Sequence, residues 1–179
     1  MVRKLRFSYK ITLGAMATAL TLVALYASSV LPAGRLVCFF LSSLFAYALC
    51  AEGAYMSAFI SFLASATLAF LLIPDKNVLL PYVILLGHYG IFRTFLYARV
   101  KDFLLRSALL LIYCNAFTAI GILLAMFVLR LDVMALLPDL ALWLLIVAAE
   151  AGFVALGVLY AIAAHYYDIR LRSLLIPRR

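Results

Sequence analysis

The sequence has little of what a soluble protein needs on its surface. Only 12% of its 179 residues are charged, whereas 69% are hydrophobic. A soluble globular domain carries roughly 25% charged residues. This chain therefore has too little polar surface to coat a soluble globule, and its composition indicates a membrane protein.

The motifs of common enzymes are also missing. There is no GxSxG, no HExxH and no phosphate-binding loop, and seven acidic residues are too few to assemble a two-metal site readily. The three cysteines, Cys38, Cys50 and Cys114, form no CxxC pair, and we expect them to be small apolar fillers. We therefore expect no enzyme, no metal and no cofactor. Any active transport would have to take its energy from another subunit.

What the sequence does have is long apolar runs separated by turn residues. The runs are long enough to cross a hydrocarbon core, and they lack the alternating pattern of a β-barrel. They predict six helices, at about residues 10–31, 36–51, 54–73, 79–98, 104–129 and 138–166. The predicted fold is an all-α membrane protein, a compact bundle of six transmembrane helices that forms one domain over residues 1–179.

Basic residues gather on one side of the predicted membrane. Twelve of the 15 lysines and arginines precede the first helix, lie around the turn between the fourth and fifth, or follow the sixth: Arg3, Lys4, Arg6, Lys10, Arg93, Arg99, Lys101, Arg106, Arg170, Arg172, Arg178 and Arg179. The positive-inside rule makes that side cytoplasmic and places both termini there. The net charge of +8 is then explained by topology and by contact of the basic segments with anionic lipids. We therefore expect no nucleic-acid partner.

Three polar residues lie deep inside the predicted helices. With a rise of 1.5 Å per residue, His88 lies roughly 14 Å from the outer end of its helix, Asn115 roughly 16 Å from the inner end and Glu150 roughly 18 Å from the outer end. In a core about 30 Å thick, all three fall near the midplane. An isolated carboxylate there is costly, so we expect Glu150 to be protonated or paired with His88 or Asn115. A substrate site and a structural polar cluster are both compatible with this pattern.

Two charged residues nearer the helix ends are interpreted differently. Arg93 is about a turn and a half from the cytoplasmic end of its helix, and it can extend its side chain to the interface. Glu52 precedes Gly53 between the second and third helices, and we expect it to be a solvated turn residue.

The first helix is rich in small residues at i,i+4 spacing. Its segment GAMATALTLVALYASS contains four such pairs: Gly14 with Thr18, Ala15 with Ala19, Ala17 with Thr21, and Ala24 with Ser28. Small residues let helix backbones approach closely in a membrane. The pairs cover much of the helix surface, which allows two interpretations. Either all of them pack against other helices of this chain, or one face of the helix packs within the chain and another face binds a partner protein.

These features together resemble the substrate-binding S components of energy-coupling factor transporters. The resemblance lies in the chain length, the six helices, the cytoplasmic termini, the basic N-terminus and the AMATA motif. It implies uptake of a small molecule such as a vitamin or another micronutrient, across a prokaryotic cell membrane. It also implies a separate pair of ATPases and a transmembrane coupling subunit that contacts Ala15 and Ala19. Substrate sites in that family lie in the outer half, among the last three helices and the outer loops. Those helices hold His88, Asn115 and Glu150, which lie somewhat deeper and are our candidate substrate-binding residues.

Other classes of protein remain open at this stage. The segments LLIPDKNVLLPYVILLGHYGIFR and EAGFVALGVLYAIAAHYYDIRLR also resemble uncharacterised six-helix bacterial membrane proteins. A non-transporting scaffold of cell-envelope assembly, similar to the rod-shape-determining D proteins, has a similar helix count and few charges. A small enzyme acting on lipid head groups is a third class.

The predicted topology can be tested by cysteine labelling in a background that lacks the native cysteines. Cysteines introduced at Asn77 and Asp132 should react with an impermeant maleimide in intact cells, because they lie in outer loops. Cysteines at Ser8 and Ser173 should react only after permeabilisation. Labelling at Ser173 in intact cells would contradict the prediction.

Overall fold

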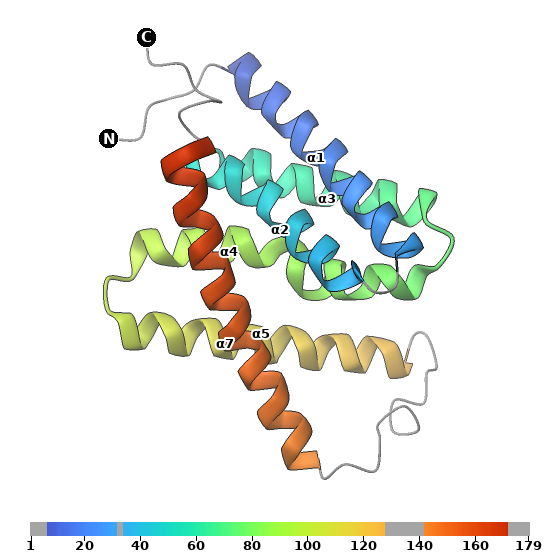
Figure 1. Ribbon diagram of the computed structural model, residues 1–179, viewed down its shortest axis with the longest axis vertical. Helices are drawn as coiled ribbons and strands as arrows, with labels where there is room; N and C mark the ends of the chain where they lie inside the picture. The colour runs from blue at the N-terminus through green and yellow to red at the C-terminus, as the bar shows by residue number, and fades with distance from the viewer. Residues whose placement is uncertain (1–6, 32–33, 128–141, 172–179) are drawn as a thin grey trace. The chain divides into compact units, whose positions relative to one another are not determined.

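The computed structural model describes residues 7–31, 34–127 and 142–171, and helices dominate all three ranges. In chain order, the α-helices are α1 (Phe7–Val30), α2 (Arg35–Ala51), α3 (Tyr55–Leu72), α4 (Gly87–Arg99), α5 (Phe103–Phe127) and α7 (Leu142–Tyr166). The described part of the chain contains no strand (Figure 1). The six predicted helices are therefore confirmed to within a few residues, except that the predicted limits at 129 and 138 fall outside the described residues.

Four helices are long and apolar enough to cross a membrane. Their candidate spans are Ser8–Val30, Tyr55–Leu72, Phe103–Leu124 and Ile146–Arg170. The apolar helix α2 has 17 residues, which corresponds to roughly 26 Å. The helical character and the apolar spans match a membrane protein.

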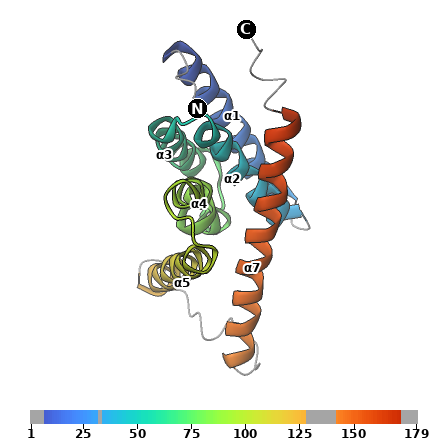
Figure 2. The same cartoon turned by 90° about the vertical axis from the view of Figure 1, so that its left-hand side faces the viewer.

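The chain divides into two units, Met1–Arg106 and Ser107–Arg179, and each is described by itself. In the first unit, α2 packs against α1, α3 and α4 (Figures 1 and 2). Its side chains explain this central place, because one stripe of α2 is buried and combines small with aromatic residues: Phe39, Ser42, Ser43, Ala46, Tyr47, Leu49 and Cys50.

Helix α1 packs through its small residues. The hydroxyl of Ser61 on α3 donates to the Gly14 carbonyl at 2.9 Å, and the Thr18 hydroxyl donates to Ser61 at 3.0 Å. On the face towards α2, the Thr21 hydroxyl donates to the Ser42 carbonyl at 3.4 Å. A hydroxyl can reach the backbone of the next helix only where the two backbones come close, which small residues allow.

A tight turn joins α2 to α3. The Gly53 N–H bonds to the Cys50 carbonyl at 2.9 Å, and the Ala54 N–H bonds to the Leu49 carbonyl at 3.0 Å. This is the Schellman motif, and Gly53 takes the left-handed conformation it requires, with φ of 72°. Ala54 then accepts the first hydrogen bond of the next helical stretch, from Ala58. The turn therefore reverses the chain within three residues.

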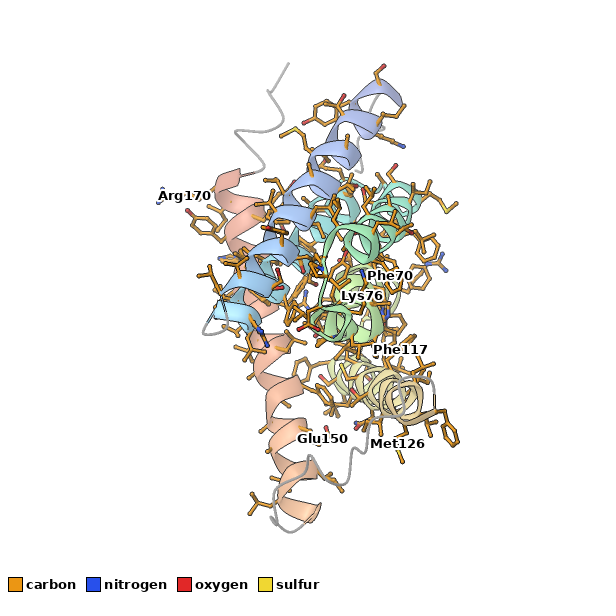
Figure 3. The ribbon with its side chains drawn as sticks, turned by 90° about the vertical axis from the view of Figure 1, so that its right-hand side faces the viewer. Phe70, Lys76, Phe117, Met126, Glu150 and Arg170 are labelled. Carbon is orange, nitrogen blue, oxygen red and sulfur yellow. The ribbon has the colours of Figure 1, made fainter. Side chains whose placement is uncertain are left out.

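The segment before α4 is helical but irregular. A 3₁₀ turn, Lys76–Leu79, leads into a π-helical turn, Tyr82–Leu86, which continues directly into α4. In the π turn the Gly87 N–H bonds to the Tyr82 carbonyl, five residues back. Lys76 donates to the carbonyl of Phe70 at the end of α3, and both residues are labelled in Figure 3. The predicted helix at 79–98 is thus one continuous helical run with a π turn inside it.

Phe62 of α3 fills the space beside this π turn. Its ring centre lies 5.9 Å from that of Tyr82 and 5.5 Å from that of His88. Gly87 leaves room for it, because a Cβ there would lie 2.5 Å from a ring carbon of Phe62 and 2.9 Å from the Tyr82 carbonyl oxygen. The contact between α3 and the π turn therefore requires glycine at position 87.

The second unit contains most of α5, the helix α7 and a terminal π turn, Tyr167–Leu171. Most side chains of both α-helices are exposed and apolar, including Ile112 and Ile120 on α5 and Val154 and Ile162 on α7. Helices that are apolar on all sides are typical of membrane spans. Glu150, labelled on α7 in Figure 3, interrupts this surface.

Replacing Gly87 by alanine should destabilise the first unit by about 1–3 kcal/mol, the usual cost of overpacking. The new methyl group would collide with Phe62 and with a backbone oxygen that cannot move aside. Thermal unfolding in detergent measures the change.

A matched control is Gly152→Ala on α7, where nothing lies within 4 Å of the added Cβ. It should leave the unfolding temperature unchanged. A Phe62→Leu change added to Gly87→Ala should recover part of the loss. Equal unfolding temperatures for wild type and Gly87→Ala would contradict the packing described here.

Candidate functional site

A polar pair joins α5 and α7 in the second unit. The Asn115 side-chain amide donates to Oε1 of Glu150 at 2.6 Å and to the Leu111 carbonyl at 3.0 Å. Asn115 is exposed and Glu150 is half-buried, so both are accessible in this unit. The sequence predicted that Glu150 needs a partner such as Asn115, and the structure provides that contact.

The hydrogen bonds determine what this pair can still bind. A carbonyl oxygen can only accept, so the group that bonds to Leu111 must be the amide nitrogen of Asn115. Both N–H bonds of that nitrogen are then in use, one on Leu111 and one on Glu150. The remaining polar atoms are the amide oxygen and the second carboxylate oxygen, and both are acceptors when Glu150 is ionised. The pair therefore suits a group that donates hydrogen bonds, such as a protonated amine.

His88 lies in the first unit and makes its contacts beside the π turn. Its ring meets Phe62 edge-on, and it hydrogen-bonds to the backbone of Val83 and Ile84. A π turn contains one residue more than an α-helical turn, so one carbonyl loses its usual partner. His88 can supply the missing donor from its side chain. This gives His88 a structural role that the sequence did not reveal.

The predicted cluster of His88, Asn115 and Glu150 is therefore supported for two of its members. Asn115 and Glu150 bond to each other within one unit, whereas His88 belongs to the other unit. A three-membered cluster remains a prediction from the sequence.

Two charged residues of the first unit are more buried than expected. Glu52 and Arg93 are each 4% exposed. The predictions of a solvated Glu52 and of an Arg93 that reaches the interface are therefore wrong. The Schellman turn places Glu52 at the C-cap of α2, and the guanidinium of Arg93 lies 4.2 Å from the ring centre of Tyr97 on its own helix.

Glu52 and Arg93 lie near the same end of the unit. Tyr55, three residues after Glu52, has its ring centre 6.4 Å from that of Phe95, two residues after Arg93. Ile91 of α4 also packs against the cluster containing Leu49 and Cys50 at the end of α2. Sequence reasoning missed this site because both residues stand close to helix ends, where charges are usually solvated.

The small residues of α1 are used unequally. Gly14 and Thr18 contact Ser61, and the pairs Ala17 with Thr21 and Ala24 with Ser28 are buried. Ala15 and Ala19 are exposed. Three of the four predicted pairs thus pack within the first unit, and the fourth is available on its surface.

The cysteines and the acidic residues form no metal site in residues 7–31, 34–127 and 142–171. No three His, Cys, Asp or Glu side chains gather there in an arrangement that could hold a metal ion. Cys38, Cys50 and Cys114 are free thiols, and Cys50 and Cys114 are buried.

A double-mutant cycle tests whether Asn115 and Glu150 interact. Asn115→Leu and Glu150→Leu should each destabilise the protein, because each leaves the other polar group in apolar surroundings. The double variant should be more stable than the sum of the two losses predicts, by about 0.6 kcal/mol, the average for polar pairs between membrane helices, and by at most about 1.7 kcal/mol. Unfolding by denaturing detergent measures all four proteins.

The same cycle with His88→Leu tests the larger cluster. A coupling between His88→Leu and Glu150→Leu would support a three-membered site, and strict additivity would limit the site to Asn115 and Glu150. Additivity between Asn115 and Glu150 themselves would contradict the hydrogen bond described above.

The pair therefore offers a carboxylate and an amide oxygen between two apolar helices. No protein-family model, no curated protein and no solved structure matches this chain.

Proposed function

We propose that this protein is the substrate-binding integral membrane subunit of an uptake transporter of the energy-coupling factor type. Its cargo is a small molecule, vitamin-like or another micronutrient, and a separate ATPase module supplies the energy. The observation that carries the proposal is the Asn115–Glu150 hydrogen bond between two long apolar helices. Polar groups at such positions are costly and usually functional.

The pair also narrows the substrate class. Its unused atoms are acceptors, so the bound group should be a hydrogen-bond donor, and a positive charge would strengthen the bond to the carboxylate. A protonated amine or an amidine-like nitrogen group meets both conditions. A purely anionic substrate would meet repulsion from Glu150.

A second observation supports a partner subunit. Of the four small-residue pairs within GAMATALTLVALYASS, Ala15 with Ala19 is the pair that stays exposed. Several of its neighbours are large and apolar, such as Met16 and Leu20. A partner helix can approach most closely where a small residue leaves a groove. This is the position that the coupling subunit would contact.

Ala15→Leu/Ala19→Leu should abolish copurification of the coupling subunit and the ATPase pair from native membranes. The leucine side chains would fill the groove while leaving the rest of α1 packed. Mass spectrometry of the tagged, purified protein measures the recovery of each partner.

The matched control is Ala151→Leu/Ala155→Leu, which changes two exposed alanines at the same spacing on α7. It should keep full recovery of the partners. Recovery of cell-wall synthesis proteins instead of an ATPase pair would favour the scaffold function. Full recovery of an ATPase pair by the Ala15→Leu/Ala19→Leu variant would refute the proposed partner surface.

Substrate binding can be tested separately with a panel of amine-bearing vitamins and micronutrients. A ligand present well above its Kd should raise the unfolding temperature of the wild type. Glu150→Gln should raise the Kd of that ligand about tenfold or more, because it removes the negative charge that accepts the hydrogen bond. If the panel contains a ligand that stabilises wild type and Glu150→Leu equally, the pair is not the binding site.

A further inference from the structure

Three arginines surround two aromatic rings at the α4–α5 turn of the first unit. The guanidinium carbons of Arg93 and Arg106 lie 4.2 and 3.8 Å from the ring centre of Tyr97. The guanidinium of Arg99 lies 5.1 Å from the ring centre of Phe95. Cation–π contacts of this kind hold a guanidinium in place without neutralising its charge.

The positive charge of this cluster exceeds the negative charge nearby. This end has two described carboxylates, Glu52 and Asp102, against four basic residues, Arg93, Arg99, Arg106 and the exposed Lys101. Asp102 already caps α5, because its carboxylate accepts the Leu104 N–H at 3.1 Å. Two guanidiniums on one ring also repel each other. An external anion would relieve this repulsion.

Arg106 shows where such an anion would bind. Its Nε is buried and has no hydrogen-bond partner in the structure. Its guanidinium carbon lies 3.8 Å from the ring centre of Tyr97 and 5.8 Å from that of Phe103. The planar guanidinium fork matches phosphate oxygens, and fixing it in advance lowers the entropy lost on binding.

The surroundings distinguish a lipid phosphate from a free one. The first turn of α5 exposes three large apolar side chains, Phe103, Leu104 and Leu105. Cations beside an exposed apolar surface fit a molecule with an anionic head and hydrocarbon chains. A free phosphate would gain nothing from these three side chains.

We propose that Arg106 and Arg99, held by the rings of Tyr97 and Phe95, form a binding site for the phosphate group of an anionic phospholipid, and that the buried Arg93 adds its positive charge nearby. The guanidiniums of Arg106 and Arg99 bind the phosphodiester, and Phe103, Leu104 and Leu105 contact the acyl chains. The site gives the protein a specific lipid beyond the general attraction between basic residues and an anionic membrane. It is independent of the proposed substrate site on α5 and α7.

Native mass spectrometry of the full chain in detergent tests the proposal. Phosphatidylglycerol, phosphatidylcholine and inorganic phosphate are titrated separately. Phosphatidylglycerol should bind about tenfold more tightly than phosphatidylcholine, whose choline group adds a positive charge, and Arg106→Gln should abolish that difference. Arg106→Lys should keep part of it, because it retains the charge and loses the fork.

Two further variants separate the site from folding defects. Tyr97→Leu should weaken phosphatidylglycerol binding, because it removes the ring that holds both guanidiniums, whereas Tyr97→Phe should bind like the wild type. Arg35→Gln is the matched charge control, since Arg35 lies at the opposite end of α2 from Glu52 and bonds to the Ser28 carbonyl. It should bind phosphatidylglycerol normally.

Three outcomes would overturn the proposal. They are equal binding of phosphatidylglycerol by wild type and Arg106→Gln, an equal loss in Arg35→Gln and Arg106→Gln, and saturation by inorganic phosphate at the concentrations that suffice for the lipid. The first outcome would show that Arg106 does not bind the lipid. The second would show that the lipid binds through non-specific charge attraction, and the third would assign the site to a free phosphate.

Discussion

The backbone hydrogen-bond ladder is the constraint on which the rest of this structure depends. In surroundings without water, each N–H and each carbonyl needs a partner inside the protein. Regular helices supply nearly all of these partners, and the irregular places are repaired locally. The Schellman turn satisfies the end of α2, and His88 bonds to the backbone beside the π turn. Several polar side chains of the first unit thus hydrogen-bond to backbone groups.

Small residues are the second requirement, because they let the helices come close enough for side chains to reach neighbouring backbones. Ser61 can bond to the Gly14 carbonyl only where α1 and α3 nearly touch. Gly87 admits the Phe62 ring in the same way. The first unit therefore combines close backbone contacts with a few aromatic side chains that fill the gaps. The second unit has exposed apolar helices, and the Asn115–Glu150 hydrogen bond joins two of them.

The helices were predictable because long apolar runs leave few other structures to consider. The Asn115–Glu150 contact was one of the alternatives expected, since a deep carboxylate requires a partner and Asn115 and His88 both lie at a similar depth. The π turn was not foreseen, because the proline and glycine of PYVILLG indicate a loosened helix but do not specify a π turn. The inward position of Glu52 was also missed, because Gly53 reveals a turn but not the direction of the side chain before it. The contact between His88 and Phe62 was also not predicted, because the depth of a residue in the membrane does not reveal which face of the helix it occupies.

The π turn has a consequence for how α4 is aligned. A regular helix advances by about 100° per residue, so one extra residue offsets everything that follows by that angle. His88 and Arg93 both come after the turn and therefore owe their directions to it. A chain one residue shorter between Tyr82 and Leu86 would form an unbroken α-helix of nearly the same length. It would direct His88 away from Phe62 and Arg93 away from the end of α2. One additional residue is thus enough to change which side chains of α4 point towards α2 and α3, with almost no change in composition.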